Sequence, residues 1–323
     1  MADSVFAKRA TGAGTALSLG TMNFGKRTNE AESIKLIHLA LERGVRVIDT
    51  ANLYCGGQSE SIVGRALKGR SEEVILATKV GADRIKGKSE GLSKAQVLRS
   101  AEASLKRLGR ERVDVFYLHM PDPLTPLEET LEAVAELLNR KRIGRFAVSN
   151  FASWQILEVI ELCRKLGLEP PALSQQLYNV LIRQLDLEYF RFAAKYQLHT
   201  TVYNPLAGGL LTARGVLAES VEAGSRFDGN RLYQQRYFTE TLRTEAKHYA
   251  SLAAAHGLSL LQLAYGFLAS HAEVDSVLVG PGSSEHLLEA HEALANKPLT
   301  PELRSEIDAR HKRYLGTEAC YAR

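Results

Sequence analysis

Short runs of β-branched and other apolar residues recur about every 30 residues along this chain, which is the spacing of strands alternating with helices. Eight such runs lie at 16–22, 45–50, 74–80, 113–119, 143–149, 172–177, 200–204 and 274–280. Segments of helical period lie between most of them, for example at 29–43, 94–108, 126–138, 153–166 and 284–294. Alternation of this kind is typical of parallel strands joined by crossover helices, so it predicts an α/β fold.

Eight strand and helix units in one uninterrupted chain favour a closed (β/α)8 TIM barrel over a doubly wound open sheet. A doubly wound nucleotide-binding domain usually carries a three-glycine fingerprint after its first strand. The nearest candidate, GAGTAL at 12–17, lacks the third glycine and precedes a strand instead of opening a helix. We therefore predict a single barrel domain over 1–323, with a long loop after the seventh strand at 205–238 and an extra C-terminal helix at 301–314.

Charge and cysteine content exclude several other classes of protein. Lysine and arginine number 41 and aspartate and glutamate 37, a net charge of +4 without long basic blocks, which argues against nucleic acid as a partner. No stretch approaches the roughly 18 apolar residues of a membrane helix, and the first residues lack a signal-peptide core, so we expect a cytoplasmic protein with no membrane partner. Cys55, Cys163 and Cys320 show no paired spacing for zinc, and their odd number suits a reducing compartment better than a disulfide framework.

Ionisable residues occupy the ends of three successive predicted strands. Asp49, Lys79 and His119 each stand where an apolar run stops, and Tyr54 follows Asp49 in the next loop. Taken singly, Asp49 could cap a turn, Lys79 could extend to water, His119 could be a core histidine and Tyr54 a loop aromatic. Because the loops after the strands build the active site of a barrel, the four together indicate a catalytic group.

The acidities of these side chains suggest one kind of chemistry. A tyrosine with a pKa near 10 is a poor acid at neutral pH, but the ammonium of Lys79 would lower the pKa of Tyr54. Asp49 would keep Lys79 charged, and His119 would orient the oxygen that receives the proton. Such a group suits protonation of a carbonyl oxygen while hydride arrives at carbon. Since none of the four can carry a hydride, a redox cofactor is required.

Eight ordered motifs carry a family resemblance: GTMNFG at 20–25, GVRVIDTANLYCGGQSESIVGRAL at 44–67, ATKVG at 77–81, LHMPD at 118–122, VSNF at 148–151, QQLYN at 175–179, YNPLAGGLLT at 203–212 and VLVGPGSSEHLLEA at 277–290. In this order and spacing the chain resembles the aldo-keto reductases over nearly its whole length. The resemblance implies a (β/α)8 barrel that binds a nicotinamide dinucleotide, usually the 2′-phosphorylated form. It also places the family's catalytic tetrad on Asp49, Tyr54, Lys79 and His119, with Tyr54 as the proton donor.

The resemblance further implies a cofactor surface. Tyr203 corresponds to an aromatic residue that stacks on the nicotinamide ring, and Ser149, Asn150 and Gln175 to residues that hydrogen-bond its carboxamide. Backbone groups near the glycine pair at 208–209 would approach the pyrophosphate. The full expected set is Thr21, Met22, Asp49, Ser149, Asn150, Gln175, Tyr203, Asn204, Leu206, Gly208, Leu210, Arg214, Gly280, Gly282, His286 and Glu289.

The segment after the eighth strand departs from the family pattern. Relatives grip the adenosine phosphate there with a serine, an arginine or glutamine, and a Glu-Asn pair, whereas this chain has Gly282, His286, Glu289 and Ala290. Glu289 can still take the adenine amino group, and the helix that opens at 283–284 can hold an anion. The missing guanidinium could be replaced from the long loop, by Arg214, Arg226 or Arg231. The expected cofactor is NADPH, with NADH as an alternative.

The residues near the tetrad predict a largely apolar pocket for a small-molecule aldehyde or ketone. Its candidate walls are Phe24, Cys55, Met120 and Phe151, with Phe227 or Tyr237 from the long loop. The segment SRFDGNRLYQQRYF at 225–238 is similar to the aflatoxin aldehyde reductase branch and its bacterial relatives, several of which form dimers or larger assemblies, so a homo-oligomer is an open expectation.

The leading hypothesis is an NADPH-dependent reductase whose reaction is reversible to alcohol oxidation. Two alternatives remain open. One is a Schiff-base lyase that uses Lys79, against which the anionic neighbour Asp49 argues. The other is a cofactor-binding regulatory protein, because the family resembles the cytoplasmic β subunits of potassium channels.

Overall fold

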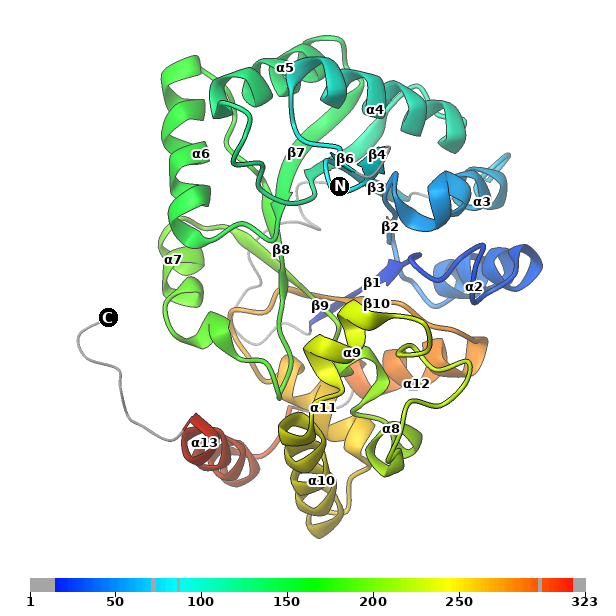
Figure 1. Ribbon diagram of the computed structural model, residues 1–323, viewed down its shortest axis with the longest axis vertical. Helices are drawn as coiled ribbons and strands as arrows, with labels where there is room; N and C mark the ends of the chain where they lie inside the picture. The colour runs from blue at the N-terminus through cyan, green and yellow to red at the C-terminus, as the bar shows by residue number, and fades with distance from the viewer. Residues whose placement is uncertain (1–14, 71–73, 86–87, 296–297, 316–323) are drawn as a thin grey trace.

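Eight parallel strands close into a barrel in the order β1-β10-β9-β8-β7-β6-β3-β2 (Figure 1). The computed structural model describes residues 15–70, 74–85, 88–295 and 298–315. The barrel strands are β1 (Ala16–Gly20), β2 (Val47–Asp49), β3 (Ile75–Val80), β6 (Val113–Leu118), β7 (Ile143–Ser149), β8 (Leu173–Leu177), β9 (His199–Tyr203) and β10 (Ser276–Val279). Each overlaps one of the predicted runs, and the (β/α)8 prediction is confirmed.

Helices surround the barrel, and all but the last two join consecutive strands (Figure 1). They are α2 (Glu30–Glu42), α3 (Gln58–Ala66), α4 (Lys94–Leu108), α5 (Leu127–Asn139), α6 (Ser153–Leu166), α7 (Tyr189–Lys195), α10 (Glu240–Ala255), α11 (Leu260–Ala269) and α12 (Ser284–Ala295), followed by the predicted extra helix α13 (Pro301–Leu315). Within the described ranges, no single helix is both long and apolar enough to cross a membrane, and α10 with α11 pass that test only as a pair bent by 90°.

Local sequence signals explain where several helices begin and end. The Asn29 side chain accepts a hydrogen bond from the Glu32 backbone N–H and caps the first turn of α2. Helices α4 and α6 end at Gly109 and Gly167, whose φ values of 63° and 67° lie in the left-handed region. Glycine adopts this conformation at low cost, and it lets the chain turn into the next strand.

The barrel interior changes from apolar to polar along its strands. Side chains of Val47, Ile75, Ala77, Val115, Tyr117, Ala147 and Leu173 form a small buried cluster inside the barrel. Alternate residues of a strand point to the same side, so Asp49 follows Val47, and Lys79 follows Ala77, on the interior face. The ionisable pair therefore lies directly above the apolar layer, at the carboxyl ends of the strands.

The segment after β9 is more structured than a loop. Residues 205–238 contain η3 (Ala207–Gly209), α8 (Ala213–Leu217) and α9 (Arg231–Tyr237), and α9 lies in front of the barrel in Figure 1. The segment contacts the connection between β1 and α2, where Arg27 donates a hydrogen bond to the Gly224 carbonyl at 3.4 Å. A short hairpin of β4 (Arg84–Ile85) and β5 (Lys88–Ser89) follows β3 and was not predicted from the sequence.

Candidate active site

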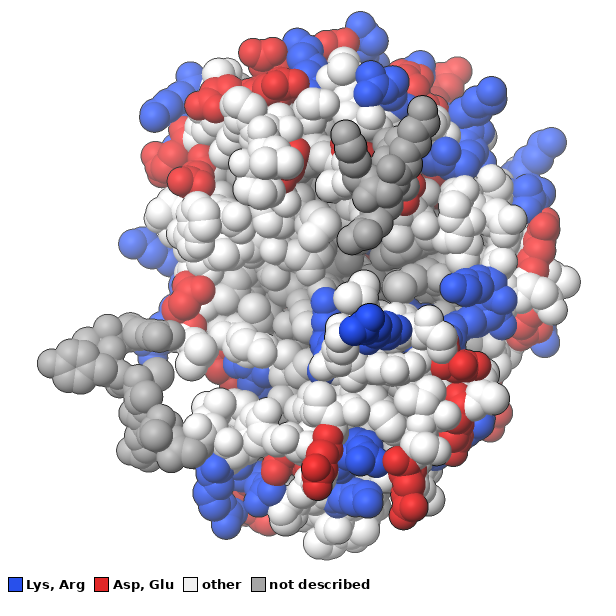
Figure 2. Space-filling view, viewed as in Figure 1, with Lys and Arg blue, Asp and Glu red and all other residues white. Residues whose placement is uncertain are grey.

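A cavity of about 1280 Å³ opens at the carboxyl ends of the strands. All eight barrel strands or the segments that follow them contribute lining residues, from Gly20 at the end of β1 to Gly280 after β10. The face shown in Figure 2 is hollowed near its centre, with lysine or arginine side chains at the lower edge of the hollow. The long segment after β9 supplies much of this wall, as expected for a functional excursion.

Lys79 is the centre of a buried polar group. Its Nζ contacts the Asp49 carboxylate and donates to the Thr50 carbonyl at 3.0 Å. The Tyr54 hydroxyl lies 3.4 Å from the same Nζ and lines the cavity. Gln175 Nε2 donates to the other oxygen of Asp49 at 3.0 Å, so the carboxylate is held from two sides. The structure thus brings together Asp49, Tyr54 and Lys79, three of the four residues predicted to form a catalytic group.

Burial and charge set the protonation of this group. Burial lowers the pKa of Lys79, but the Asp49 carboxylate and Tyr54 outweigh it, and the net pKa lies above the ordinary value. Burial raises the pKa of the Tyr54 phenol, and the Lys79 ammonium only partly opposes this, so its pKa also lies above the usual range. The expected net decrease in the pKa of Tyr54 is therefore wrong, because desolvation destabilises the phenolate by more than the attraction of the Lys79 ammonium stabilises it. Tyr54 holds its proton and Lys79 keeps its charge at neutral pH.

His119 completes the group from the end of β6. Its ring meets the Tyr54 ring edge to face, with centroids 6.0 Å apart and planes at 80°. Burial, followed by the charge of Lys79, lowers the pKa of His119 to about 3, so the imidazole is neutral. Its Nδ1 is buried and has no hydrogen-bond partner within the described part of the chain. A neutral ring at the cavity wall can donate to an incoming oxygen from one nitrogen.

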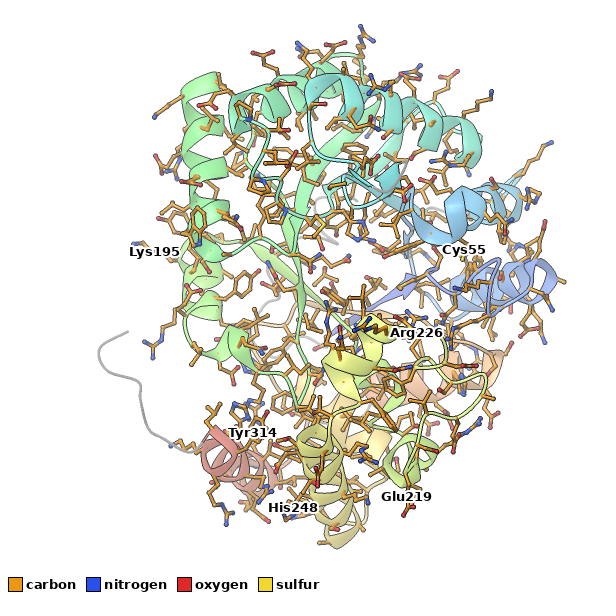
Figure 3. The ribbon with its side chains drawn as sticks, in the orientation of Figure 1. Cys55, Lys195, Glu219, Arg226, His248 and Tyr314 are labelled. Atoms are coloured by element: carbon orange, nitrogen blue, oxygen red, sulfur yellow. The ribbon has the colours of Figure 1, made fainter. Side chains whose placement is uncertain are left out.

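The turn that carries Tyr54 has unusual backbone geometry. Tyr54–Gly57 form η1, in which Cys55 has a φ of 51° and the next two glycines also have positive φ. Two glycines at 56–57 make this tight left-handed turn accessible, and it returns the chain to α3. Cys55 itself is half-buried, its Sγ lies 3.8 Å from the Met22 carbonyl, and burial raises the pKa of its thiol. Figure 3 shows Cys55 to the side of the barrel near α3.

Polar side chains at the ends of β7 to β9 form a connected row. Tyr203 donates from its hydroxyl to Asn150 Oδ1 at 2.6 Å, and Asn150 Nδ2 donates to the His119 carbonyl at 2.9 Å. Ser149 Oγ donates to the Gln175 carbonyl at 3.0 Å. All of these residues line the cavity. The row joins the tetrad to the segment after β9, and it offers both donors and acceptors of hydrogen bonds.

The glycine pair after β9 shapes the floor of the cavity. Gly208 and Gly209 have φ values of 71° and 102°. A Cβ added at Gly208 would meet Tyr233 at 3.1 Å, whereas a Cβ at Gly209 would meet no atom within 4 Å. The backbone here adopts a conformation that favours glycine and is open on one side, which suits close approach of a ligand.

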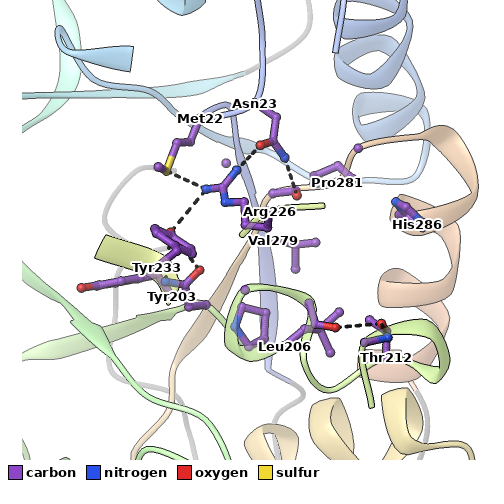
Figure 4. Close-up of a pocket in the computed structure, with 18 of the residues that line it drawn as sticks. Met22, Asn23, Tyr203, Leu206, Thr212, Arg226, Tyr233, Val279, Pro281 and His286 are labelled. Atoms are coloured by element: carbon purple, nitrogen blue, oxygen red, sulfur yellow. Dashed lines mark hydrogen bonds between the residues drawn. The ribbon is translucent and has the colours of Figure 1, made fainter. Parts of the chain in front are cut away.

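Arg226 reaches from the segment before α9 toward the centre of the barrel (Figure 3). Its guanidinium contacts Asn23 Oδ1, lies 2.9 Å from Met22 Sδ, and donates to the Tyr233 hydroxyl at 3.3 Å (Figure 4). Burial and the charge of Arg226 both lower the pKa of Arg27, so two cations lie close together at this wall. Such a pair would be stabilised by a bound anion.

Comparison with known proteins decides the family. The sequence model of the Aldo/keto reductase family matches residues 16–312. The chain belongs to the aldo/keto reductase family. Aflatoxin B1 aldehyde reductase member 2 of Rattus norvegicus is 35% identical over 301 residues, which cover 88% of this chain and 81% of the rat protein. An aldo-keto reductase of Bacillus subtilis (strain 168) is 33% identical over 298 residues, covering 90% and 87%.

A further relative has a name of a different kind. A probable voltage-gated potassium channel subunit beta of Oryza sativa subsp. japonica is 31% identical over 302 residues, covering 91% of this chain and 92% of the rice protein. The family match and the aldehyde reductase relatives make this aldo/keto reductase an oxidoreductase that acts on carbonyl groups. Among the residues that the structure describes, no group of histidine, cysteine and carboxylate side chains is arranged to hold a metal ion.

The start of α12 forms the far end of the cavity. In this segment the sequence of this aldo/keto reductase differs from its family pattern. Gly280, Gly282, His286 and Glu289 line it, and the His286 backbone N–H donates to Ser283 Oγ at 3.3 Å. Figure 4 shows His286 and Tyr203 at opposite ends of the residues drawn. Arg214, one of the predicted replacements for a guanidinium, lines the cavity but forms an ion pair with Glu222 at 2.5 Å.

Most predicted site residues line the cavity, and some do not. Among the described residues, those predicted for the site that are not part of the lining are Phe24, Cys55, Phe151, Leu210, Arg231, Tyr237, and the two buried tetrad members Asp49 and Lys79. Phe24 and Leu210 are fully buried in the core. Met120 and Phe227 do line the cavity. Asn23, Arg27 and Tyr233 were missed, because the first two lie in the connection between β1 and α2 and the third in the short helix α9, where no periodicity marks a functional residue.

Proposed function

We propose that this aldo/keto reductase uses NADPH to reduce an aldehyde or ketone, with Tyr54 protonating the carbonyl oxygen. The observation that carries the proposal is the Tyr54 hydroxyl at the cavity wall, 3.4 Å from the Lys79 ammonium. A phenol in this position can give up its proton because the adjacent charge stabilises the phenolate that remains. The reverse transfer would serve alcohol oxidation.

The lining residues fit a nicotinamide dinucleotide. Ser149, Asn150 and Gln175 offer the donors and acceptors that a carboxamide needs, and Tyr203 offers an aromatic face. The open backbone at Gly209 and the cationic wall suit a pyrophosphate. When bound, the reduced nicotinamide would supply the hydride that no side chain can carry. NADPH is our first choice, and NADH remains an alternative because His286 lies where relatives have a guanidinium.

The chain's own residues divide the work on the proton. Neutral His119 would donate a hydrogen bond to the carbonyl oxygen and hold it near the Tyr54 hydroxyl. Asp49 keeps Lys79 protonated throughout, since its carboxylate contacts Nζ in a fully buried position. Met22 and Leu53 are among the apolar residues of the cavity lining, and they would reduce the access of water to the reacting carbonyl.

The test is Tyr54→Phe, with Tyr117→Phe as the matched control. Tyr117 is a second tyrosine beside Lys79, its ring centroid 5.5 Å from Nζ, and is not among the described lining residues. Turnover of 4-nitrobenzaldehyde with NADPH should fall by about 10²-fold or more in Tyr54→Phe, the usual contribution of a general acid, and by only a few-fold in the control. Binding of NADPH and NADH, followed by quenching of intrinsic fluorescence, should change little in either. Equal loss of binding and turnover in Tyr54→Phe would contradict the assignment of Tyr54 as the acid.

A second candidate function is a cofactor-binding regulator, favoured by the potassium channel β relative. Tight NADPH binding with negligible aldehyde turnover by the unmodified protein would support it. The lyase alternative is disfavoured, because the Asp49 carboxylate keeps Lys79 protonated and therefore not nucleophilic. Borohydride trapping of a substrate on Lys79 would reverse that judgement.

A further inference from the structure

A buried carboxylate lies outside the tetrad and has no role in the reaction described above. Glu90 stands between the β4-β5 hairpin and α4 and is 8% exposed. A carboxylate that is removed from water needs hydrogen bonds to replace its hydration, so the donors around it show what it holds in place.

One oxygen of Glu90 reaches the turn that carries Tyr54. Asn52 Nδ2 donates to Glu90 Oε1 at 2.7 Å, and Asn52 is also buried. Asn52 lies two residues before Tyr54, and its backbone N–H donates to the Lys79 carbonyl at 3.0 Å. Ser100 on α4 donates to the same Glu90 oxygen. The turn is therefore attached to the rest of the barrel through the Asn52 side chain as well as its backbone.

The other oxygen of Glu90 holds the chain directly after Lys79. The backbone N–H groups of Gly81 and Asp83 donate to Oε2 at 2.7 Å and 3.2 Å. Gly81 is two residues beyond Lys79 and directly follows β3. One carboxylate thus links the segment that bears the proton donor to the segment that bears the ammonium, and its two oxygens receive donors from both.

We propose that Glu90 and Asn52 are positioning residues that set the distance between the Tyr54 hydroxyl and the Lys79 ammonium. Proton transfer is sensitive to displacements of well under 1 Å, and the benefit of the ammonium to the phenolate falls with distance. Loss of the link would let the turn move away from β3. The inference rests on the proposed reductase function, and it concerns the rate of the proton step, not the binding of the cofactor.

The test compares Asn52→Ala, Glu90→Ala and their double variant in the full-length protein. Each single variant should lower kcat with 4-nitrobenzaldehyde about tenfold or more, because even a slight misplacement of a reacting group slows the reaction, while the Kd for NADPH stays within about twofold. The apparent pKa of Tyr54 in the pH profile of kcat should rise, because the phenolate loses part of its stabilisation. The double variant should be no slower than Glu90→Ala, since both changes break one link.

Two further variants separate positioning from general loss of stability. Glu129 is a carboxylate on α5 that accepts a hydrogen bond from the Lys94 backbone N–H at 2.9 Å, away from the turn that bears Tyr54 and from the end of β3 in sequence. Glu129→Ala should lower the thermal midpoint without changing kcat or its pH profile. Asn52 Oδ1 is buried and has no hydrogen-bond partner within the described part of the chain. In the Glu90→Gln variant the Asn52 amide can therefore rotate by half a turn, so that its oxygen accepts a hydrogen bond from the new amide N–H. Glu90→Gln should then recover most of the activity lost in Glu90→Ala.

The outcomes distinguish this inference from the proposed function. Suppose first that the unmodified protein reduces the aldehyde, so that the reductase function stands. The positioning role is then refuted if Asn52→Ala keeps kcat within twofold. It is also refuted if the losses of the two single variants multiply in the double variant with an unchanged pH profile. If the unmodified protein binds NADPH but reduces no aldehyde, the proposed function fails and this inference fails with it. Should Glu90→Ala not fold, Asn52→Ala and Glu90→Gln decide the question.

Discussion

Removal of one partner of the buried ion pair should destabilise the whole barrel. Lys79 and Asp49 side chains are 0% and 2% exposed. At a contact separation of about 3 Å and an effective dielectric constant of about 20, their attraction is about 5 kcal/mol, most of which offsets the cost of burying two charges. Asp49→Asn leaves the buried Lys79 ammonium with neutral hydrogen-bond partners and no opposite charge, so we expect the free energy of unfolding at pH 7 to fall by about 3–5 kcal/mol.

The pH dependence of this loss has a defined sign. In the unmodified protein the pKa of Lys79 is raised, so its contribution to stability is complete below the unfolded value of about 10.4 and is lost as the pH rises through the folded value. In Asp49→Asn the opposing carboxylate is gone and burial lowers the pKa of Lys79. The unfolded chain then binds more protons, and stability rises with pH up to about 10.4. The deficit of the variant should therefore shrink between neutral and alkaline pH.

Urea denaturation at several pH values measures both effects, and Asp49→Leu/Lys79→Met is the control. The double variant replaces both charges by apolar groups of similar size, and such replacements are often neutral or stabilising, so it should unfold within about 2 kcal/mol of the unmodified protein. A loss below about 1 kcal/mol in Asp49→Asn, or a double variant as unstable as the single one, would refute the argument that an uncompensated buried charge dominates.

Three further predictions concern other parts of the cavity. His286→Arg should raise the ratio of NADH to NADPH dissociation constants about tenfold, because one charge-assisted hydrogen bond to the 2′-phosphate contributes about 1.4 kcal/mol more; an unchanged ratio in fluorescence titrations would place the phosphate elsewhere. Gly208→Ala should cost about 1–2 kcal/mol in urea denaturation, since its φ of 71° is strained for alanine and the Cβ meets Tyr233 at 3.1 Å, and a loss near zero would contradict that. Because the pKa of His119 is about 3, kcat should show no histidine ionisation between about pH 5 and 8, and an acid limb in this range that disappears in His119→Gln would contradict its neutral state.

The placement of ionisable residues at the strand ends was predictable because the signals that mark it are local. When a buried strand ends at an ionisable residue, the sequence itself shows which residue stands at the strand end. The two-residue alternation then places Asp49 and Lys79 on the interior face without knowledge of the rest of the fold. The capping glycines and the regular spacing of units likewise act within short segments. The closed barrel, its order of helices and the encounter of the tetrad members follow from such signals.

The microenvironment of the tetrad was not predictable in the same way. From sequence, the Lys79 charge suggests a lowered pKa for Tyr54, but the balance of desolvation and attraction depends on how completely the barrel excludes water. Phe24 and Phe151 look like pocket walls by their proximity to motifs, yet the fold turns both into the core.

Contacts between distant connections belong wholly to the tertiary structure. Arg226 meets Met22 across a separation of 204 residues, and Glu90 meets Asn52 across 38. Hydrophobic periodicity in a sequence indicates which face of a single helix or strand is buried. The closure of the barrel, in contrast, decides which connections meet at the carboxyl ends of the strands. The sequence by itself therefore determined the architecture and the candidate catalytic side chains, and the tertiary structure decided their protonation, the residues that hold them in place and the shape of the cavity.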